Sequence, residues 1–357
     1  MIKKILKILG ISLLILIGVP LIIGQVLRLI SHTEPPPGQM VDVGGYKLHI
    51  NCISPDGTAA EDLPTVIFEA GAGVTTPVNY WIQNGVSKTT NICVYDRAGI
   101  GWSEESNLPR DAKTVNEALH TLLDKSNIKR PFVFAGHSIA GLYMRDYVER
   151  YPDEVIGIAF LDPSHPKQYE MFNFSESQRK ELDDSVVSQI STIDWLIKFG
   201  VLEVYNPLLQ VDGGFTSYPE KVQKQMEYLS KRPTSHNAFL AELRDFDKAA
   251  KQAENNKTLG DRPIVVISAT KPWDKNMLPD FITPESMKSV MEKMHEEITA
   301  LSTNGKRVKI DTADHMGLIT NKDNAAKAVP YIIEVLRESA NNYRSSQKEK
   351  AQTNTEK

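Results

Sequence analysis

The segment GHSIAG at 136–141 places a serine at the apex of a predicted tight turn, after the apolar run Phe132–Ala135 and before a predicted helix. Such a strand-turn-helix elbow needs small residues two before and two after the serine, because larger side chains would collide with neighbouring backbone. Gly136 and Ala140 meet that need, although the strict pattern has glycine at the second position. The turn therefore predicts Ser138 as a nucleophile; the alternative is an ordinary helix cap.

A serine hydroxyl attacks efficiently only when a base removes its proton, and that base is usually a histidine held by a carboxylate. Among eight histidines, His315 follows the last predicted strand in a short loop before the final predicted helix. This position is at the same carboxyl edge of the sheet as Ser138. We therefore predict His315 as the general base; the alternative is an ordinary loop histidine.

A serine nucleophile also needs backbone N–H groups directed at the oxyanion that forms on attack. In an elbow of this kind one donor belongs to the residue after the nucleophile, here Ile139, and the other comes from the loop after the third strand. That loop is EAGAG at 69–73, whose glycines let the backbone turn and expose N–H groups. We predict Ala72 as the second donor; the alternative is a plain glycine-rich turn.

A sheet must position these residues, and eight short apolar runs predict its strands. They are residues 41–43, 46–53, 65–69, 91–95, 132–135, 155–161, 264–268 and 308–310. Gly44-Gly45 predicts a hairpin between the first two, and helical stretches such as 115–126 separate most of the others. Strands that alternate with helices form βαβ units. The predicted fold class is α/β, with an antiparallel start and a mostly parallel eight-stranded sheet.

The alternation stops between residues 166 and 258, which show helical periodicity and no convincing strand. An insertion after the sixth strand would lie over the carboxyl edge of the sheet, where open α/β folds bind ligands. We predict a helical lid; the alternative is a separate helical domain or peripheral packing. The core is then divided into residues 41–165 and 259–340, and the polar residues 341–357 are predicted as a disordered tail.

The amino terminus carries an uncharged stretch of 20 residues, Ile8 to Leu27, which as a helix is about 30 Å long. It exceeds a signal-peptide h-region, and no small-x-small cleavage site follows it. Three lysines precede it and Arg28 follows, which places the amino terminus in the cytoplasm. We predict residues 1–31 as a single-pass cell-membrane anchor and the proline-rich residues 32–40 as a linker to an extracytoplasmic domain. The alternatives are a cleaved signal peptide or a buried helix.

Five ordered motifs carry a resemblance to a known superfamily. They are EAGAG at 69–73, YDRAGIGWS at 95–103, GHSIAG at 136–141, LDPSHP at 161–166 and DHMG at 314–317. Over residues 41–339 the chain resembles the α/β-hydrolase superfamily, in particular lid-bearing serine hydrolases of the esterase and lipase type. The resemblance implies that Trp102 lines the substrate pocket and that Asp96 and Arg97 are structural. Ser138 disfavours epoxide hydrolases, dehalogenases and dienelactone hydrolases, whose elbows carry Asp or Cys.

The carboxylate partner of the histidine has two candidates. The common order of the triad is Ser, Asp, His, with the acid after strand seven, and Asp274 follows that predicted strand. It lies one residue later than the usual spacing of the family. Some relatives place the acid after strand six, where this chain has Asp162. We favour Asp274 and keep Asp162 as the alternative.

Composition excludes several classes of protein. Lys plus Arg number 41 and Asp plus Glu number 45, a formal charge of −4, so no nucleic-acid partner is expected. Neither cysteine has metal-ligand spacing, and the chain lacks a P-loop, an HxxxH motif and an EF-hand loop, so no metal or cofactor is expected. The sheet order of the superfamily makes the strands of Cys52 and Cys93 neighbours. A disulfide between them and two buried free thiols are both open.

These observations predict a membrane-anchored serine hydrolase that cleaves a small or lipid-like carboxylic ester through an acyl-enzyme. The same triad would also serve a carbon-carbon bond hydrolase or a cofactor-free peroxidase. A third reading is a ligand receptor without enzymatic activity, because a fold does not fix a function.

Overall fold

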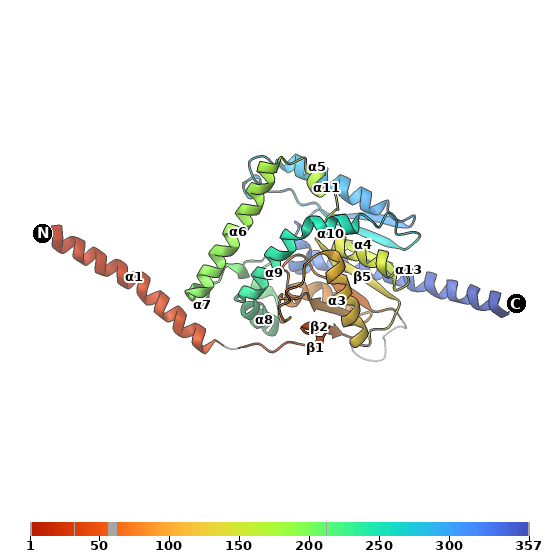
Figure 1. Ribbon diagram of the computed structural model, residues 1–357, viewed down its shortest axis with the longest axis horizontal. Helices are drawn as coiled ribbons and strands as arrows, with labels where there is room; N and C mark the ends of the chain where they lie inside the picture. Colours follow the sequence, from red (N-terminus) through yellow and green to blue (C-terminus); the bar gives the residue numbers. More distant parts are fainter. Residues whose placement is uncertain (1, 32, 56–62, 212, 356–357) are drawn as a thin grey trace.

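The structure is a computed structural model of the 357-residue chain (Figure 1). It describes all residues except 1, 32, 56–62, 212 and 356–357, and it leaves the side chains of residues 2, 8, 13–15, 17, 277 and 354–355 undescribed.

An eight-stranded sheet forms the centre of the protein, in the order β1-β2-β4-β3-β5-β6-β7-β8. Its strands are β1 (Gln39–Asp42), β2 (Lys47–Ile53), β3 (Val66–Glu69), β4 (Ile92–Asp96), β5 (Phe132–His137), β6 (Val155–Leu161), β7 (Ile264–Ala269) and β8 (Gly305–Ile310). The pairs β1-β2 and β2-β4 are antiparallel, and the other pairs are parallel. The predicted fold class, with an antiparallel start and a mostly parallel sheet, is confirmed.

Helices cover both faces of this sheet, which explains why its central strands are apolar throughout. Along β5, Phe134 contributes to the apolar cluster beneath α3 (Ala112–Lys125), α4 (Ala140–Arg150) and α11 (Pro284–Thr299). Its neighbours Val133 and Ala135 contribute to the opposite cluster, beneath α2 (Tyr80–Val86), α12 (Gly317–Thr320) and α13 (Lys322–Thr355). Successive side chains of a strand point to opposite faces, so a strand covered on both sides has no polar face.

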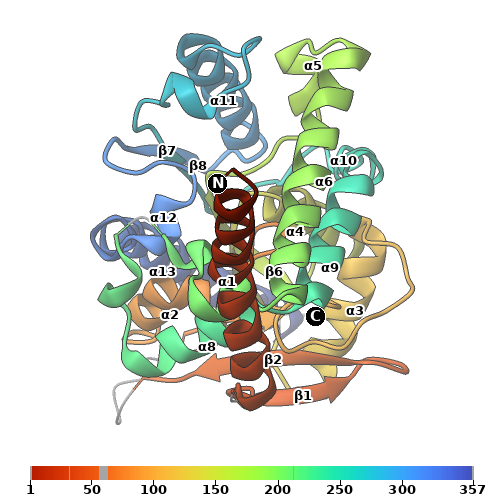
Figure 2. The same cartoon turned by 90° about the vertical axis from the view of Figure 1, so that its left-hand side faces the viewer.

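The insertion between β6 and β7 is helical, as the periodicity predicted. Its helices are α5 (Gln168–Phe172), α6 (Glu176–Lys198), α7 (Val201–Val204), α8 (Glu220–Ser230), α9 (Pro233–Arg244) and α10 (Phe246–Ala253). Figure 2 shows α6 and α9 beside each other, on the side of the molecule from which α1 (Ile2–Ile30) projects. Ser175 caps the amino terminus of α6 in a capping box, in which its side chain accepts a hydrogen bond from the Gln178 N–H.

Helix α1 projects from the body of the protein (Figure 1) and contacts the insertion near α7. Gln25 Nε2 and Arg28 Nη1 both donate to the Lys198 carbonyl, at 2.8 and 3.0 Å. Within the described residues, no helix combines the length and apolar content that crossing a bilayer requires. The structure therefore does not support the predicted spanning helix. The predicted run Ile8 to Leu27 includes residues 8, 13–15 and 17, whose side chains lie outside the description.

The prediction of a disordered tail at 341–357 was wrong for the residues described. Helix α13 continues to Thr355, well past Ala340, the last residue of its buried face. A helix that is already formed extends without a new nucleation step, and residues 347–352 of the exposed segment, QKEKAQ, are all good helix formers. Polarity alone therefore did not distinguish a coil from an exposed helix.

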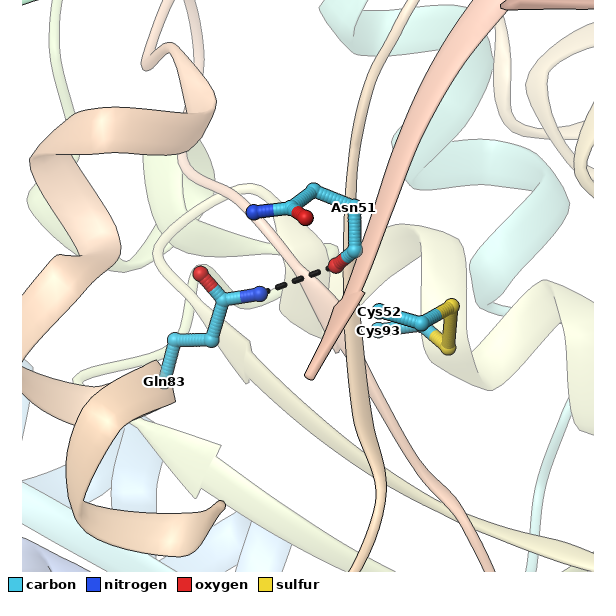
Figure 3. The surroundings of a disulfide bond; sticks show 4 residues. All are labelled: Asn51, Cys52, Gln83 and Cys93. Atoms are coloured by element: carbon cyan, nitrogen blue, oxygen red, sulfur yellow. Dashed lines mark hydrogen bonds between the residues drawn. A yellow bond between two sulfur atoms is a disulfide. The ribbon is translucent and has the colours of Figure 1, made fainter. Parts of the chain in front are cut away.

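Cys52 and Cys93 form a disulfide between β2 and β4 (Figure 3). The antiparallel register places the two residues directly opposite each other. Beside the bridge, Gln83 Nε2 of α2 donates to the Asn51 carbonyl at 2.9 Å and attaches that helix to β2. Of the two possibilities left open by the sequence, the structure has the bridge.

Candidate active site

Ser138 lies at the sharp turn between β5 and α4, with a φ of +60° that non-glycine residues seldom adopt. Close packing explains the small residues around it. A Cβ on Gly136 would lie 2.7 Å from the Cβ of Ala140, and one on Gly141 would lie 2.6 Å from the Ser164 carbonyl oxygen. The structure therefore has the sharp strand-turn-helix geometry that the sequence predicted, and Ala140 fits where the strict pattern has glycine.

His315 lies in the loop after β8 and pairs with Asp162, the residue directly after β6. Its Nδ1 is 2.6 Å from Asp162 Oδ2, and Asp162 Oδ1 accepts the Ala269 N–H at 2.9 Å. Asp162 is buried, whereas the side chain of His315 is 30% exposed. Although burial raises the pKa of Asp162, the hydrogen bond and charge of His315 outweigh that effect and hold the pKa below its usual value. The pair therefore joins an ionised carboxylate to a histidine that solvent reaches.

The preference for Asp274 as the partner of His315 was wrong. Asp274 is exposed and begins the short helix η4 (Lys275–Met277), where its Oδ1 accepts the Asn276 N–H at 2.9 Å. Asp274 lies five residues beyond the end of β7 and caps the amino terminus of η4. Nδ1 of His315 is already paired with Asp162. The structure brings Ser138, His315 and Asp162 to one edge of the sheet, and Asp162 is the acid that the sequence kept as the alternative.

His137, one residue before the elbow serine, holds the loop of His315 against the elbow. Its Nε2 is 2.8 Å from the His315 backbone carbonyl oxygen, and the two rings lie 4.4 Å apart. Burial, followed by the nearby His315, lowers the pKa of His137 to about 3. A neutral His137 must carry its proton on Nε2 to make this bond, so it serves as a fixed donor. Nothing in the sequence had indicated this role.

The predicted oxyanion donors lie on two segments that meet at Ser138. A Cβ on Gly71 would lie 2.9 Å from His137 Nδ1 and 3.5 Å from the Cβ of Ser138, so the loop after β3 is in contact with the elbow. Within the described part of the chain, the backbone N–H groups of Ala72 and Ile139 donate to no protein acceptor. They are therefore available to a negative oxygen beside Ser138.

Asp96 and Arg97, expected to be structural, are buried behind this site. Asp96 Oδ2 is 2.8 Å from His49 Nδ1, and Asp96 Oδ1 accepts the Thr76 N–H at 2.7 Å. The Asp96 carboxylate thereby joins β2, β4 and the start of η1 (Thr76–Asn79). Buried carboxylates of this kind are stable because several donors satisfy them.

Trp102, which the resemblance assigned to the substrate pocket, contacts the segment before β1 and a strand of the sheet. Its indole Nε1 donates to the Glu34 carbonyl at 2.9 Å, and its ring packs 4.9 Å from that of His49. These contacts attach the segment before β1 to the sheet. None of the contacts described for Trp102 reaches Ser138 or His315.

A second histidine, which the sequence did not single out, lies behind the acid. His295 Nε2 is 3.8 Å from Asp162 Oδ1, and its Nδ1 is 2.8 Å from Ser268 Oγ, which also accepts a hydrogen bond from Arg307. His295 is 1% exposed, and this burial lowers its pKa. It lies with Met294 and Ile298 on the buried face of α11. A histidine on an apolar helical face was the signal that could have identified it.

The described residues contain no cluster of His, Cys, Asp or Glu that could hold a metal ion. A cavity of about 290 Å³ lies beside the acid, between β7, β8 and α11, and is lined by residues including Trp273, Met291 and His295.

Comparisons with known proteins concern the fold that carries this site. Residues 64–193 match the model of a family described as having the alpha/beta hydrolase fold. The chain is 29% identical to the uncharacterized protein YbdG of Bacillus subtilis, over 54% of this chain and 57% of that protein. It is 24% identical to an AB hydrolase superfamily protein of Gibberella zeae, over 55% and 58%. The chain thus spans less than two thirds of the length of these relatives.

Solved structures show the same fold at lower identity. A bromoperoxidase from Bacillus anthracis superposes with a TM-score of 0.59 at 14% identity, covering 83% of this chain and 99% of that one. A loop variant of the haloalkane dehalogenase DbeA from Bradyrhizobium elkanii gives 0.58 at 14% identity, covering 85% and 98%. These neighbours have different activities in their names, so they identify the fold alone.

Proposed function

Since the chain belongs to the α/β-hydrolase superfamily, we propose that it is a serine hydrolase that cleaves carboxylic esters through an acyl-enzyme intermediate. The observation that carries this proposal is the 2.6 Å contact between His315 Nδ1 and Asp162 Oδ2 at the sheet edge where Ser138 forms the elbow. An ionised, buried carboxylate fixes the histidine tautomer that leaves Nε2 free to accept a proton.

In the proposed reaction, Ser138 Oγ attacks the ester carbonyl carbon while His315 Nε2 accepts the hydroxyl proton. The carbonyl oxygen becomes an oxyanion and accepts hydrogen bonds from the Ala72 and Ile139 N–H groups. Collapse of the tetrahedral intermediate breaks the bond to the alcohol, which leaves with the proton from His315. A water molecule then attacks the acyl-serine by the same route and releases the acid. Asp162 stays ionised and stabilises the imidazolium in both halves.

An activated serine would distinguish this proposal from a receptor without activity. We expect a fluorophosphonate probe to label the wild-type protein and Ser164→Ala, a control serine at the same sheet edge, and to leave Ser138→Ala unlabelled. Absence of labelling in the wild-type protein would contradict an activated serine and favour a receptor. A labelled protein that hydrolyses no p-nitrophenyl ester but cleaves a diketone would instead favour carbon-carbon hydrolysis.

We also propose that the run Ile8 to Leu27 anchors the protein to the cell membrane, with the hydrolase domain outside. The proposal depends on the uncharged stretch and the preceding lysines, and the disulfide of Cys52 and Cys93 is compatible with an oxidising compartment. The test is cell fractionation followed by protease added outside intact cells. A soluble form that lacks residues 1–30 would show cleavage and contradict the anchor.

A further inference from the structure

A buried cluster of charged side chains joins the helical insertion to the loop that carries one predicted oxyanion donor. Arg97 lies between two carboxylates, with Nη1 2.5 Å from Glu69 Oε1 and Nε 2.5 Å from Glu242 Oε1. The exposed fractions of Glu69, Arg97 and Glu242 are 1%, 3% and 0%. Glu242 belongs to α9, so a residue of the insertion is part of the core beneath the site.

The cluster also holds the backbone of the loop on both sides of Ala72. Arg97 Nη1 donates to the Ala70 carbonyl at 2.8 Å, and Nη2 donates to the Gly71 carbonyl at 2.7 Å. On the other side, Glu242 Oε2 accepts the Gly73 N–H at 2.9 Å. The same Oε2 accepts from Arg97 Nη2 at 3.1 Å, so one carboxylate satisfies both the guanidinium and the loop.

These bonds determine the direction of the Ala72 N–H. In a trans peptide unit, the carbonyl of one residue and the N–H of the next point in opposite directions. Because the Gly71 carbonyl points at Arg97, the Ala72 N–H of the same peptide unit points away from Arg97. The elbow is in contact with the loop at Gly71, where an added Cβ would meet His137 and Ser138. The Val74 N–H also donates to the Gly71 carbonyl, at 3.2 Å, so the shorter bond from the guanidinium sets the orientation of the donor together with this turn.

Helix α9 packs closely enough on these loops to fix Glu242 in place. A Cβ on Gly73, whose φ is +67°, would lie 2.9 Å from the Cβ of Phe239, and one on Gly99 would lie 3.0 Å from the Cβ of Ala238. Ser235 Oγ accepts the Gly101 N–H at 3.1 Å. Contacts along the whole helix thus reach the loops after β3 and β4.

We propose that Glu242 is a positioning residue: through Arg97 and the Gly73 N–H it orients the Ala72 N–H, so that docking of the insertion completes the oxyanion hole. This inference rests on the proposed serine hydrolase mechanism. The Tyr95 hydroxyl donates a hydrogen bond to Glu69 Oε2, so the second oxygen of that carboxylate also has a partner. Glu242 has the different task of bridging Arg97 and the loop, and its loss leaves buried donors unpaired.

The test compares Glu242→Gln with Glu227→Gln, a control on the exposed face of α8, in hydrolysis of a p-nitrophenyl ester and inhibition by a trifluoromethyl ketone. The ketone forms a hemiketal with the serine whose oxyanion needs the same donors. We expect Glu242→Gln to lower kcat and weaken the inhibitor by a similar factor, about 10²-fold, with KM little changed. The control should match the wild-type protein in all three values.

A purely structural role would lower the melting temperature and leave the inhibition constant of the folded protein unchanged, and that result would overturn the proposal. Arg97→Lys is the second variant, because an ammonium group cannot bind both carboxylates and the loop carbonyls at once. This variant should show the same parallel loss of kcat and of inhibitor affinity. If neither variant folds, the cluster is structural and the proposal fails. Failure of the serine hydrolase mechanism is recognised separately, by a wild-type protein that the fluorophosphonate probe does not label.

Discussion

Replacement of Asp162 by asparagine tests the acid assignment, and the structure predicts how the amide would orient. Oδ1 of Asp162 accepts the Ala269 N–H at 2.9 Å, and an NH₂ group cannot accept that bond. The amide oxygen of Asp162→Asn must therefore face Ala269, so its NH₂ group faces His315 Nδ1. A donor at that position requires an unprotonated Nδ1 and moves the histidine proton to Nε2, where it blocks removal of the serine proton.

The wrong tautomer should lower kcat by about 10⁴, equivalent to about 5.5 kcal/mol in activation free energy. We expect p-nitrophenyl ester hydrolysis by Asp162→Asn to fall by this factor, while titration of active serine at high probe concentration and thermal melting confirm an intact fold.

Asp274→Asn is the matched control. Asp274 is exposed and its only described hydrogen bond, from the Asn276 N–H, can equally be accepted by an amide oxygen. We expect kcat to stay within about twofold of the wild-type value, since an exposed cap contributes little to a site it does not touch. A dead Asp274→Asn protein, or an Asp162→Asn protein that retains a tenth of the activity, would refute the reasoning.

Three further predictions follow from the fold. Burial lowers the pKa of His137 to about 3, so the folded protein binds this proton more weakly than the unfolded chain does. The free energy of unfolding should therefore fall as the pH drops below about 6.5, by about 2 kcal/mol at pH 5. Urea titrations should show a smaller fall for His137→Gln, and an equal dependence of the free energy of unfolding on pH in both proteins would contradict this. Replacing both Cys52 and Cys93 by alanine opens a loop with a sequence separation of 41 and should lower the free energy of unfolding by up to about 4 kcal/mol in non-reducing urea titrations. A reducing agent should lower the wild-type value to that of the variant, and an unchanged variant would contradict this. The insertion carries the aromatic residues Trp195, Phe199, Tyr205, Phe215, Tyr228 and Phe239. If they form an acyl pocket, kcat/KM for p-nitrophenyl esters should increase with acyl length, since each buried methylene contributes about 0.8 kcal/mol, until the pocket is full; a flat profile would count against the pocket.

Local patterns in the sequence predicted Ser138 and His315 because each signal lies within a few residues. The elbow needs small neighbours, and the histidine follows a strand whose end must lie at the same edge of a parallel sheet. The choice between Asp162 and Asp274 depended on the path of two loops after neighbouring strands. Spacing along the chain carries no information about which loop turns toward the histidine, so the family pattern pointed to the wrong aspartate.

Other features depend on contacts between distant residues. Arg97 and Glu242 are separated by 145 positions, and each alone reads as an ordinary charged residue on a loop or a helix. The indole of Trp102 likewise packs against His49 and the segment before β1, contacts that its motif did not indicate. The exposed end of α13 was misjudged because polarity distinguishes buried from exposed residues better than helix from coil.

The positions of Ser138 and Asp162 have a consequence for directed evolution. Both follow neighbouring strands, and the Ser138 N–H donates to the Leu161 carbonyl at 3.1 Å, so the hydrogen-bonded ladder itself sets their separation. Because the acid directly follows β6, the loop after β7, residues 270–283, contains none of the proposed catalytic residues. A library of insertions or a grafted affinity peptide in this loop would vary the rim near the histidine while leaving the reacting groups in register.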